Sequence, residues 1–283
     1  MPVVLEKKYI PEFTETLPIV KWAGGKRQLI ADLKNNLPKK FNRYFEPFIG
    51  GGALFFNIQP ENAYISDINP ELINLYQVIK NNTYELIEDL KQHKNTEEYF
   101  YEIRNIDRNS KYKKWSDVQK ASRFIYMNRT CFNGLYRVNS KGEFNVPFGK
   151  YSNPRILDEI NLLNCSQLFQ NTEIKCSDFS EILNHVQKGD FVYLDPPYAP
   201  LNETSSFTSY TKEGFGEDMQ VKLKELCDEL DKMGVHFMLS NSDTKGINKL
   251  YKNYEIKKVF ASRAINSVAS KRGKITEVLV RNY

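Results

Sequence analysis

Four consecutive residues, Asp195-Pro196-Pro197-Tyr198, carry the residue types best suited to chemistry in this chain. They follow the apolar run Phe191 to Leu194, which predicts a buried strand. Proline fixes its own φ and has no amide hydrogen, so the exit from this strand is rigid, and the Pro196 carbonyl and the Asp195 carboxylate are left as acceptors. Two acceptors beside the flat face of Tyr198 suit a planar ring that carries an NH2 group. The alternative is an ordinary strand-to-loop exit, because Pro-Pro ends many strands.

A glycine turn, Gly50-Gly51-Gly52, follows the predicted strand Arg43 to Glu46 and precedes a predicted helix. Glycines there let the backbone approach a ligand closely and adopt positive φ without strain. Phe55 occupies the third glycine position of the dinucleotide pattern, and the Gly-Lys-Ser/Thr of a phosphate-binding loop is absent. Gly50 and Gly52 are therefore expected to contact a nucleoside without a pyrophosphate. S-adenosylmethionine fits, because it combines a nucleoside, an amino acid and a sulfonium.

Two aspartates follow other predicted strands. Asp67 ends the strand Ala63 to Ser66, where a carboxylate can accept hydrogen bonds from ribose hydroxyls at the carboxyl edge of a parallel sheet. Asp178 follows the strand Thr172 to Cys176 and can reach the cofactor, or it can cap the helix that comes next. For Asp178 both interpretations stay open.

The predicted elements that position these residues alternate between strand and helix at both ends of the chain. The order β-α-β-α up to residue 79 implies a parallel sheet, with Asn69 capping a helix whose first residue is Pro70. Strand patterns stop between Thr83 and Arg129 and return at Thr172. The predicted helices between the strands are Thr83 to His93, Glu97 to Asn109 and Asp117 to Arg129; the later predicted elements are the helix Glu217 to Met233 and the strands Val235 to Leu239, Tyr254 to Val259 and Ile275 to Arg281.

The composition excludes several classes of protein. The 283 residues are 41% hydrophobic and 27% charged, which is normal for a globular chain. No segment has the apolar length of a membrane span, and the first 13 residues lack the apolar core of a signal peptide. The four cysteines form no C-x-x-C pair and the three histidines are isolated. We therefore expect a cytoplasmic protein without a disulfide framework, metal site or histidine-based triad.

The positive charge is concentrated in one block. Residues 101–155 contain twelve lysine and arginine residues against four aspartate and glutamate residues, a net charge of +8 within a total of +5. Such a block predicts a polyanionic partner, and aromatic and asparagine residues between the charges argue against a merely solvated helix face. Lys111, Lys113 and Lys114 and the run Lys271 to Lys274 are expected to contact phosphates, which fix position without reading sequence.

The motifs together resemble one family. They occur at Lys21 to Lys26, Phe45 to Leu54, Asp67, Phe132 to Arg137, Gly142 to Gly149, and Asp195 to Tyr198. From about Ile19 to the C-terminus the chain resembles the Dam/DpnM group of DNA adenine-N6 methyltransferases, with the motifs in the same order. The resemblance implies an α/β, Rossmann-like S-adenosylmethionine-dependent sheet with an inserted, mainly helical target-recognition domain carrying a β-hairpin. The expected domains are residues 1–76 with 168–283 for catalysis and cofactor binding, and residues 77–167 for DNA recognition.

The resemblance also implies roles for single residues. Trp22, Lys26, Asp67 and Asp195 are implied to contact S-adenosylmethionine. It also implies that the site read is GATC in double-stranded DNA, and that the residues at the recognised bases are Lys21, Leu135, Arg137 and Pro147. Phe132 keeps the aromatic character that relatives place beside Asn133, at the gap left by the extruded base. Lys150 departs from relatives that have arginine there, which weakens any expectation of a bidentate contact at this position.

A hairpin is predicted from Tyr136 to Val146, turning at residues 140–142. Strand alternation puts Arg137 and Asn139 on its polar face, together with Glu143 and Asn145. Such a β-ribbon can enter the major groove, where arginine pairs with guanine O6 and N7, and Leu135 or Pro147 can meet a thymine methyl. The alternative is a hydrated hairpin face.

The predicted mechanism is direct methyl transfer to a flipped-out adenine. Asp195 and the Pro196 carbonyl accept the two N6 hydrogens, and Tyr198 stacks on the base, with Phe207 or Tyr210 closing over it. The alternatives are cytosine-N4 methylation, because this tetrapeptide serves any exocyclic amine, methylation of RNA adenine, and a DNA-binding module with a vestigial cofactor pocket. A cognate restriction endonuclease acting on the same site is the further partner expected.

Overall fold

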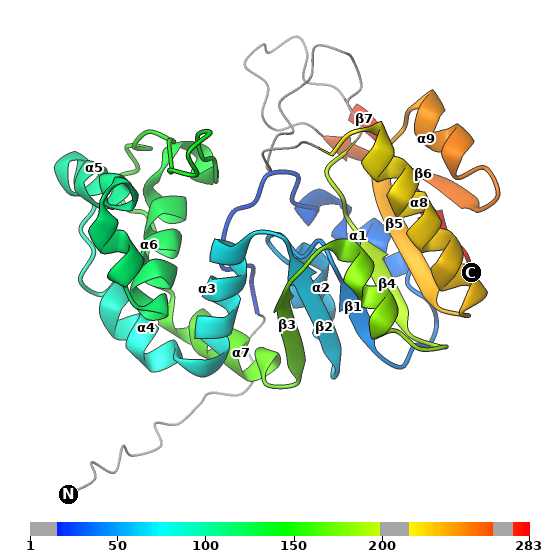
Figure 1. Ribbon diagram of the computed structural model, residues 1–283, viewed down its shortest axis with the longest axis horizontal. Coiled ribbons are helices and arrows are strands. Elements are labelled where there is room, and N and C mark those ends of the chain that lie inside the picture. Colours follow the sequence, from blue (N-terminus) through cyan, green and yellow to red (C-terminus); the bar gives the residue numbers. More distant parts are fainter. Residues whose placement is uncertain (1–15, 199–214, 263–273) are drawn as a thin grey trace, which may run out of the picture.

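A seven-stranded sheet forms the centre of the protein (Figure 1). The computed structural model describes residues 16–198, 215–262 and 274–283. The strands are β1 (Tyr44–Glu46), β2 (Ala63–Asp67), β3 (Thr172–Cys176), β4 (Phe191–Leu194), β5 (His236–Ser242), β6 (Glu255–Ser262) and β7 (Lys274–Arg281). In the order β3-β2-β1-β4-β5-β7-β6, β1 to β5 are parallel and β7 is antiparallel to both neighbours. The predicted α/β fold is thus confirmed, and the last two strands in the chain add an antiparallel edge to the parallel part of the sheet.

Helices cover both faces of the sheet. Successive strand residues point to opposite faces, and apolar residues on both faces must be buried. The helices are α1 (Ile30–Asn35), α2 (Ala53–Ile58), α3 (Pro70–Asn81), α4 (Thr83–Leu90), α5 (Glu97–Asn105), α6 (Asp117–Thr130), α7 (Glu159–Phe169), α8 (Glu217–Lys232) and α9 (Lys245–Leu250). On one face, Tyr44 and Phe191 share a core with α1, α2, α3 and α7. On the other, Phe45 and Val192 share a core with α8 and α9. Burial on both faces explains why β1 and β4 are almost purely apolar runs.

A third core belongs to the segment between the strands. It joins Phe100 and Tyr126 to Phe144 and Val146, so α5 and α6 bury the inner side of the predicted hairpin. Figure 1 shows α4, α5 and α6 gathered at one side of the molecule, with α3 between them and the sheet. The domain boundaries at residues 76–77 and 167–168 fall inside α3 and α7, which pack against each other, and they stay predictions.

Most element predictions agree with the structure, and the exceptions have physical causes. Asn69 caps α3 by accepting hydrogen bonds from two backbone amides, with Pro70 at the first helical position, as predicted. The helix expected to reach Asn109 ends at Asn105 and continues as a 3₁₀ turn. α7 and α9 were not predicted: α7 buries two asparagines and exposes Ile160, and α9 buries only Ile247, so neither shows a clear apolar face in the sequence. No helix in the described ranges is both long and apolar enough to cross a membrane.

Candidate functional site

The glycine turn leaves the sheet at the end of β1 and is closed on one side by Trp22. Gly50 and Gly52 have φ values of +44° and +65°. A Cβ atom on Gly50 would lie 2.7 Å from Cδ1 of Trp22, and one on Gly52 would lie 2.8 Å from the ring of Phe56. Both positions therefore require glycine, for conformation as well as for space. The turn presents bare backbone beside the Trp22 ring.

Asp67 faces this turn from the end of β2. Its Oδ2 accepts a hydrogen bond from the amide of Gly50 at 3.0 Å, and its Oδ1 accepts one from the amide of Asn69 at 2.9 Å. Burial raises the pKa of Asp67, and these two hydrogen bonds oppose that rise. The hydroxyl of Tyr76 donates to the Gly50 carbonyl at 2.6 Å, which fixes the turn from behind. The structure thus brings together Asp67 and the glycine turn, as predicted from the strand ends.

The tetrapeptide follows β4, the parallel neighbour of β1, so it leaves the sheet at the same edge as the glycine turn. Nζ of Lys26 lies 2.9 Å from Oδ1 of Asp195, with the two side chains 6% and 19% exposed. The same ammonium lies 4.4 Å from the centre of the Tyr198 ring. Burial raises the pKa of Asp195 to about 6, although the charge of Lys26 draws it down. The carboxylate is consequently ionised at neutral pH but close to its titration.

Two acidic residues that were not predicted for the site lie beside this carboxylate. Glu277, on β7, accepts a hydrogen bond from the hydroxyl of Tyr198 at 2.6 Å, and its charge raises the pKa of Asp195 further. Glu46, at the end of β1, is fully buried and accepts a hydrogen bond from Tyr44 at 2.6 Å. Burial raises the pKa of Glu46 well above its ordinary value. Glu277 could not be predicted from local sequence, because it lies 79 residues from Tyr198. Glu46 could have been, because it is a carboxyl group in an otherwise apolar strand.

The helix-capping interpretation of Asp178 is realised. Its side chain accepts hydrogen bonds from the amide and hydroxyl of Ser180 and forms an ion pair with Lys222 at 3.0 Å. Burial acts to raise the pKa of Asp178, but these partners outweigh it and the pKa is lowered. Contact between Asp178 and a cofactor stays a prediction.

The predicted DNA-contacting residues gather around the end of α6. The amide of Phe132 donates to the carbonyl of Pro147 at 2.9 Å. Asn128 joins Lys21 to the same loop, because its side-chain amide donates to the carbonyls of Lys21 and Gly134. The side chain of Phe132 is 52% exposed, which is unusual for an aromatic residue. The remaining predicted contacts lie on this part of the chain as well: Asn133 and Lys150 are exposed with positive φ, Pro147 is exposed, and Leu135 is half-buried.

The hairpin is shorter than predicted. One antiparallel bridge joins Val138 to Phe144, and backbone hydrogen bonds connect residue 137 with 145 and 139 with 143. The predicted faces are confirmed: Phe144 is buried, whereas Arg137 is exposed and donates to Asn145 at 2.7 Å. Asn139 closes the turn, with its Oδ1 accepting from the amides of residues 141 and 143. Its amide is therefore engaged within the hairpin, and base contact by Asn139 stays a prediction.

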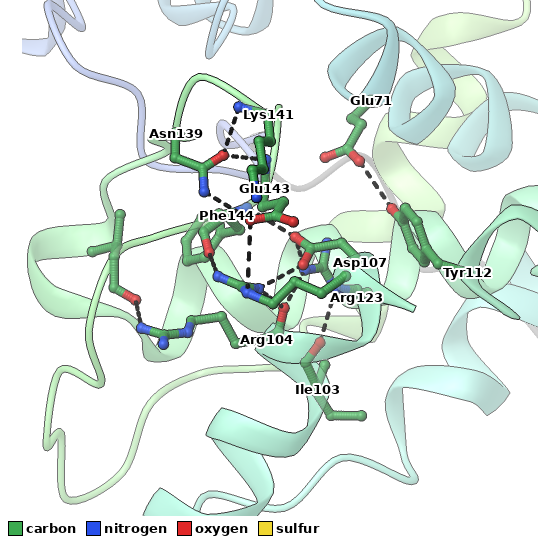
Figure 2. A network of polar contacts seen from close by, with 12 residues as sticks. Glu71, Ile103, Arg104, Asp107, Tyr112, Arg123, Asn139, Lys141, Glu143 and Phe144 are labelled. Carbon is green, nitrogen blue, oxygen red and sulfur yellow. Dashed lines mark hydrogen bonds and ion pairs between the residues drawn. The ribbon is translucent and has the colours of Figure 1, made fainter. Parts of the chain in front are cut away.

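A network of buried charges holds this short hairpin (Figure 2). Asp107 and Arg123 form an ion pair at 2.7 Å in which both side chains are almost inaccessible. The Asp107 oxygen that pairs with Arg123 also accepts a hydrogen bond from the amide of Phe144, at 2.8 Å. Arg108 donates to the carbonyl of Phe144, also at 2.8 Å. Both backbone groups of Phe144 are thereby fixed from outside the hairpin.

One segment connects the three parts of the site. Lys21 is joined by Asn128 to the loop after α6 (residues 131–150, the recognition loop), Trp22 lies against the glycine turn, and Lys26 lies against Asp195. Among the other predicted contacts, Lys111, Lys113 and Lys114 are exposed on a 3₁₀ turn. Phe207, Tyr210 and residues 271–273 lie outside the described residues, as does the side chain of Lys274.

The glycine turn, the tetrapeptide after β4 and the inserted segment all lie within a match to one known protein family. Residues 22–265 match the family model of D12 class N6 adenine-specific DNA methyltransferases. The chain belongs to this family. It is 49% identical over 270 residues to the type II methyltransferase M1.LlaDCHI of Lactococcus lactis subsp. cremoris, covering 94% of this chain and 95% of the relative. It is 45% identical to the type II methyltransferase M.MjaIII of Methanocaldococcus jannaschii, and the match covers 95% of this chain and 100% of the relative. It is 34% identical to the DNA adenine methylase of Escherichia coli K12, and that match covers 92% of this chain and 93% of the relative.

The family decides between the alternatives that the residues left open. The protein is an adenine-specific DNA methyltransferase, and the interpretations as a cytosine-N4 enzyme, an RNA enzyme or an inactive DNA-binding module are set aside. As members of a methyltransferase family, these chains use a methyl donor and act on DNA.

Proposed function

We propose that the methyl donor is S-adenosylmethionine, bound between the glycine turn and Asp67. The residues fit this molecule: the turn offers bare backbone at Gly50, no lysine follows it to hold a phosphate, and the Asp67 carboxylate suits ribose hydroxyls. When bound, S-adenosylmethionine supplies an electrophilic methyl group on a sulfonium. Trp22 covers the turn, and Gly52 and Lys26 complete the proposed contacts, with Asp178 as a further candidate.

Adenine N6 is the proposed nucleophile, held by Asp195 and the Pro196 carbonyl. The lone pair of N6 is delocalised into the ring, and the two acceptors bind its hydrogens and draw the nitrogen toward a tetrahedral geometry. Asp195 is the stronger acceptor when it is ionised, and its pKa of about 6 leaves it ionised at neutral pH. Because the methylated ammonium is acidic, no strong base is needed. Rate acceleration comes from positioning and from preorganised dipoles.

Lys26 and Tyr198 complete the proposed catalytic group. The ion pair between Lys26 and Asp195, beside Tyr198 and at the same sheet edge as the glycine turn, is the single observation that carries the proposal. Lys26 keeps the carboxylate ionised while it is shielded from water. The hydrogen bond to Glu277 fixes the Tyr198 ring in the orientation needed to stack on the base.

The proposed substrate is GATC in double-stranded DNA, with the target adenine flipped out of the helix. Phe132, exposed at the tip of α6, is suited to fill the gap beside Asn133. Arg137 is free to leave Asn145 for a guanine, because both side chains lie on the accessible face of the hairpin. Leu135 and Pro147 belong to the recognition loop and Asn128 ties Lys21 to it, which supports one shared site for the three, with Asn139 and Lys150 at its margin.

A cognate restriction endonuclease is the proposed functional partner. Two relatives at 45–49% identity carry the name type II methyltransferase, which supports a protective role. The same comparisons include proteins named DNA adenine methylase, at 34–37% identity.

The test is to treat an unmethylated plasmid with enzyme and S-adenosylmethionine and to map every modified base by sequencing. We expect N6-methyladenine in GATC and resistance of the plasmid to an endonuclease that cuts unmodified GATC. Methylation of another sequence would refute the proposed site, and methylated cytosine would refute the proposed nucleophile. Omission of S-adenosylmethionine is the control for the cofactor.

A further inference from the structure

Glu71 links the cofactor side of the molecule to the recognition side. It is the second residue of α3 and follows Asp67 by four positions. Its Oε1 accepts a hydrogen bond from the hydroxyl of Tyr112 at 2.9 Å, visible in Figure 2, and its Oε2 accepts one from the hydroxyl of Tyr136 at 3.1 Å. One carboxylate thus holds two tyrosines from different parts of the insert.

The contact with Tyr136 leads to the first arm of the hairpin and to the glycine turn. Tyr136 directly precedes Arg137. Its ring stacks on Trp22, with ring centres 5.6 Å apart and planes at 19°. Trp22 in turn closes the turn at Gly50. A shift of the hairpin arm therefore moves a ring that packs on the proposed cofactor site.

The contact with Tyr112 leads to the second arm. The guanidinium of Arg123 lies 5.1 Å from the centre of the Tyr112 ring and pairs with Asp107. Asp107 accepts the amide hydrogen of Phe144, on the arm opposite Tyr136. Glu71 is consequently connected to both arms of the hairpin, directly to one and through three side chains, Tyr112, Arg123 and Asp107, to the other.

We propose that Glu71 is a positioning residue that couples base recognition by the hairpin to binding of the cofactor. The inference rests on the proposed function, in which the hairpin reads bases and the glycine turn holds S-adenosylmethionine. Coupling of this kind is reciprocal, so cognate DNA and cofactor each raise the affinity for the other by the same factor. Glu71 touches neither ligand in this account.

A simpler role for Glu71 has to be separated from this one. An acidic residue in the first turn stabilises a helix through the helix dipole, whatever it contacts. Glu71→Gln removes the charge but keeps one oxygen to accept from one tyrosine and an NH2 group to donate to the other. Glu71→Ala removes both contacts. Glu159→Ala, an exposed first-turn change in α7, is the matched control for the dipole.

The experiment measures the affinity for S-adenosyl-L-homocysteine, the product of transfer, with saturating duplex present. The two duplexes carry the site mapped on the plasmid and a scrambled version of it. For wild type we expect at least about a fivefold tighter affinity with the cognate duplex, the lower end of typical couplings. In Glu71→Ala the ratio should fall to within about twofold of one. Glu71→Gln and Glu159→Ala should keep most of it.

Tyr136→Phe and Tyr112→Phe provide a second test if Glu71→Ala does not fold. Each removes one hydroxyl and keeps its ring, and each should lower the affinity ratio. Wild-type enzyme that fails to methylate the plasmid contradicts the proposed function itself. Active wild-type enzyme with a ratio of one, or an undiminished ratio in the folded Glu71 and tyrosine variants, overturns the coupling and leaves methyl transfer standing.

Discussion

The catalytic edge of the sheet and the recognition hairpin are built in opposite ways. Asp67 and Asp195 lie at the ends of parallel strands, and the backbone hydrogen bonds of the sheet fix where those ends are. The hairpin has a single bridge, and its position depends on side chains from the 3₁₀ turn after α5, from α6 and from α3. At the sheet edge Asp195 pairs with another side chain, Lys26, and the strands hold the backbone; around the hairpin, side chains such as Asp107 are engaged in holding the backbone.

This difference predicts how each region responds to substitution. A change at the sheet edge should remove activity and leave the fold, because the strands are held by other residues. A change in the polar network around the hairpin should reduce stability and specificity together. The predictions below test that contrast, from the largest expected effect to the smallest.

The largest effect is expected for Asp195→Ala. The variant loses the carboxylate that accepts an N6 hydrogen, so kcat should fall by about 10³-fold or more. Binding of the cognate duplex should change little, because Asp195 lies outside the recognition loop. Methyl transfer and DNA binding are measured on the same preparation. Turnover within tenfold of wild type would reject the role given to this residue.

Asp107→Ala should mainly lower stability. It leaves the Arg123 guanidinium buried without its carboxylate, and breaking a buried pair costs about 3–5 kcal/mol of unfolding free energy. The control is Asp117→Ala in the same region, because the exposed Asp117 carboxylate forms an ion pair with Lys120. This variant should lose about 1 kcal/mol or less of unfolding free energy. Chemical denaturation measures both. Equal losses would mean that the buried network does not hold the hairpin.

Lys26→Met should change the pH dependence of transfer. In wild type, kcat/KM should fall as the pH drops through about 6, because Asp195 becomes protonated. Without the Lys26 charge the carboxyl has a higher pKa, so the fall should begin at least about one pH unit higher. Lys224→Met, which removes a lysine paired with Asp228 on α8, is the control and should keep the wild-type profile. If kcat/KM of Lys26→Met fell at the same pH as that of wild type, Lys26 would not control the pKa of Asp195.

Arg137→Ala is expected to have the smallest effect, confined to specificity. Loss of one bidentate contact should relax discrimination at one base pair by about 1–3 kcal/mol. Stability should change little, since the side chain is exposed. The comparison variant, Lys113→Ala, should weaken binding to all duplexes alike and reduce the salt dependence. The measurement is kcat/KM on the cognate site and on each single-base variant of it.

Local sequence was sufficient for the sheet edge but not for the parts held by distant residues. Strand ends, the cap at Asn69 and the glycine turn are set by neighbouring residues, and the structure agrees with them. α7 was not predicted, because Asn161 is buried where an apolar residue is expected. The Asn161 side chain forms two hydrogen bonds with the backbone of Leu17. Glu71 and Glu277 gave no signal either, because their partners lie 41 to 79 residues away.

The most direct test is a crystal structure of the enzyme with S-adenosyl-L-homocysteine and a duplex containing the mapped site. We expect the target adenine outside the helix, with N6 within hydrogen-bonding distance of the Asp195 carboxylate and the Pro196 carbonyl, and the ring of Tyr198 against the base. The sulfur should lie beside the glycine turn and face N6. An adenine bound away from residues 195–198, or a cofactor away from Gly50 and Asp67, would contradict the account.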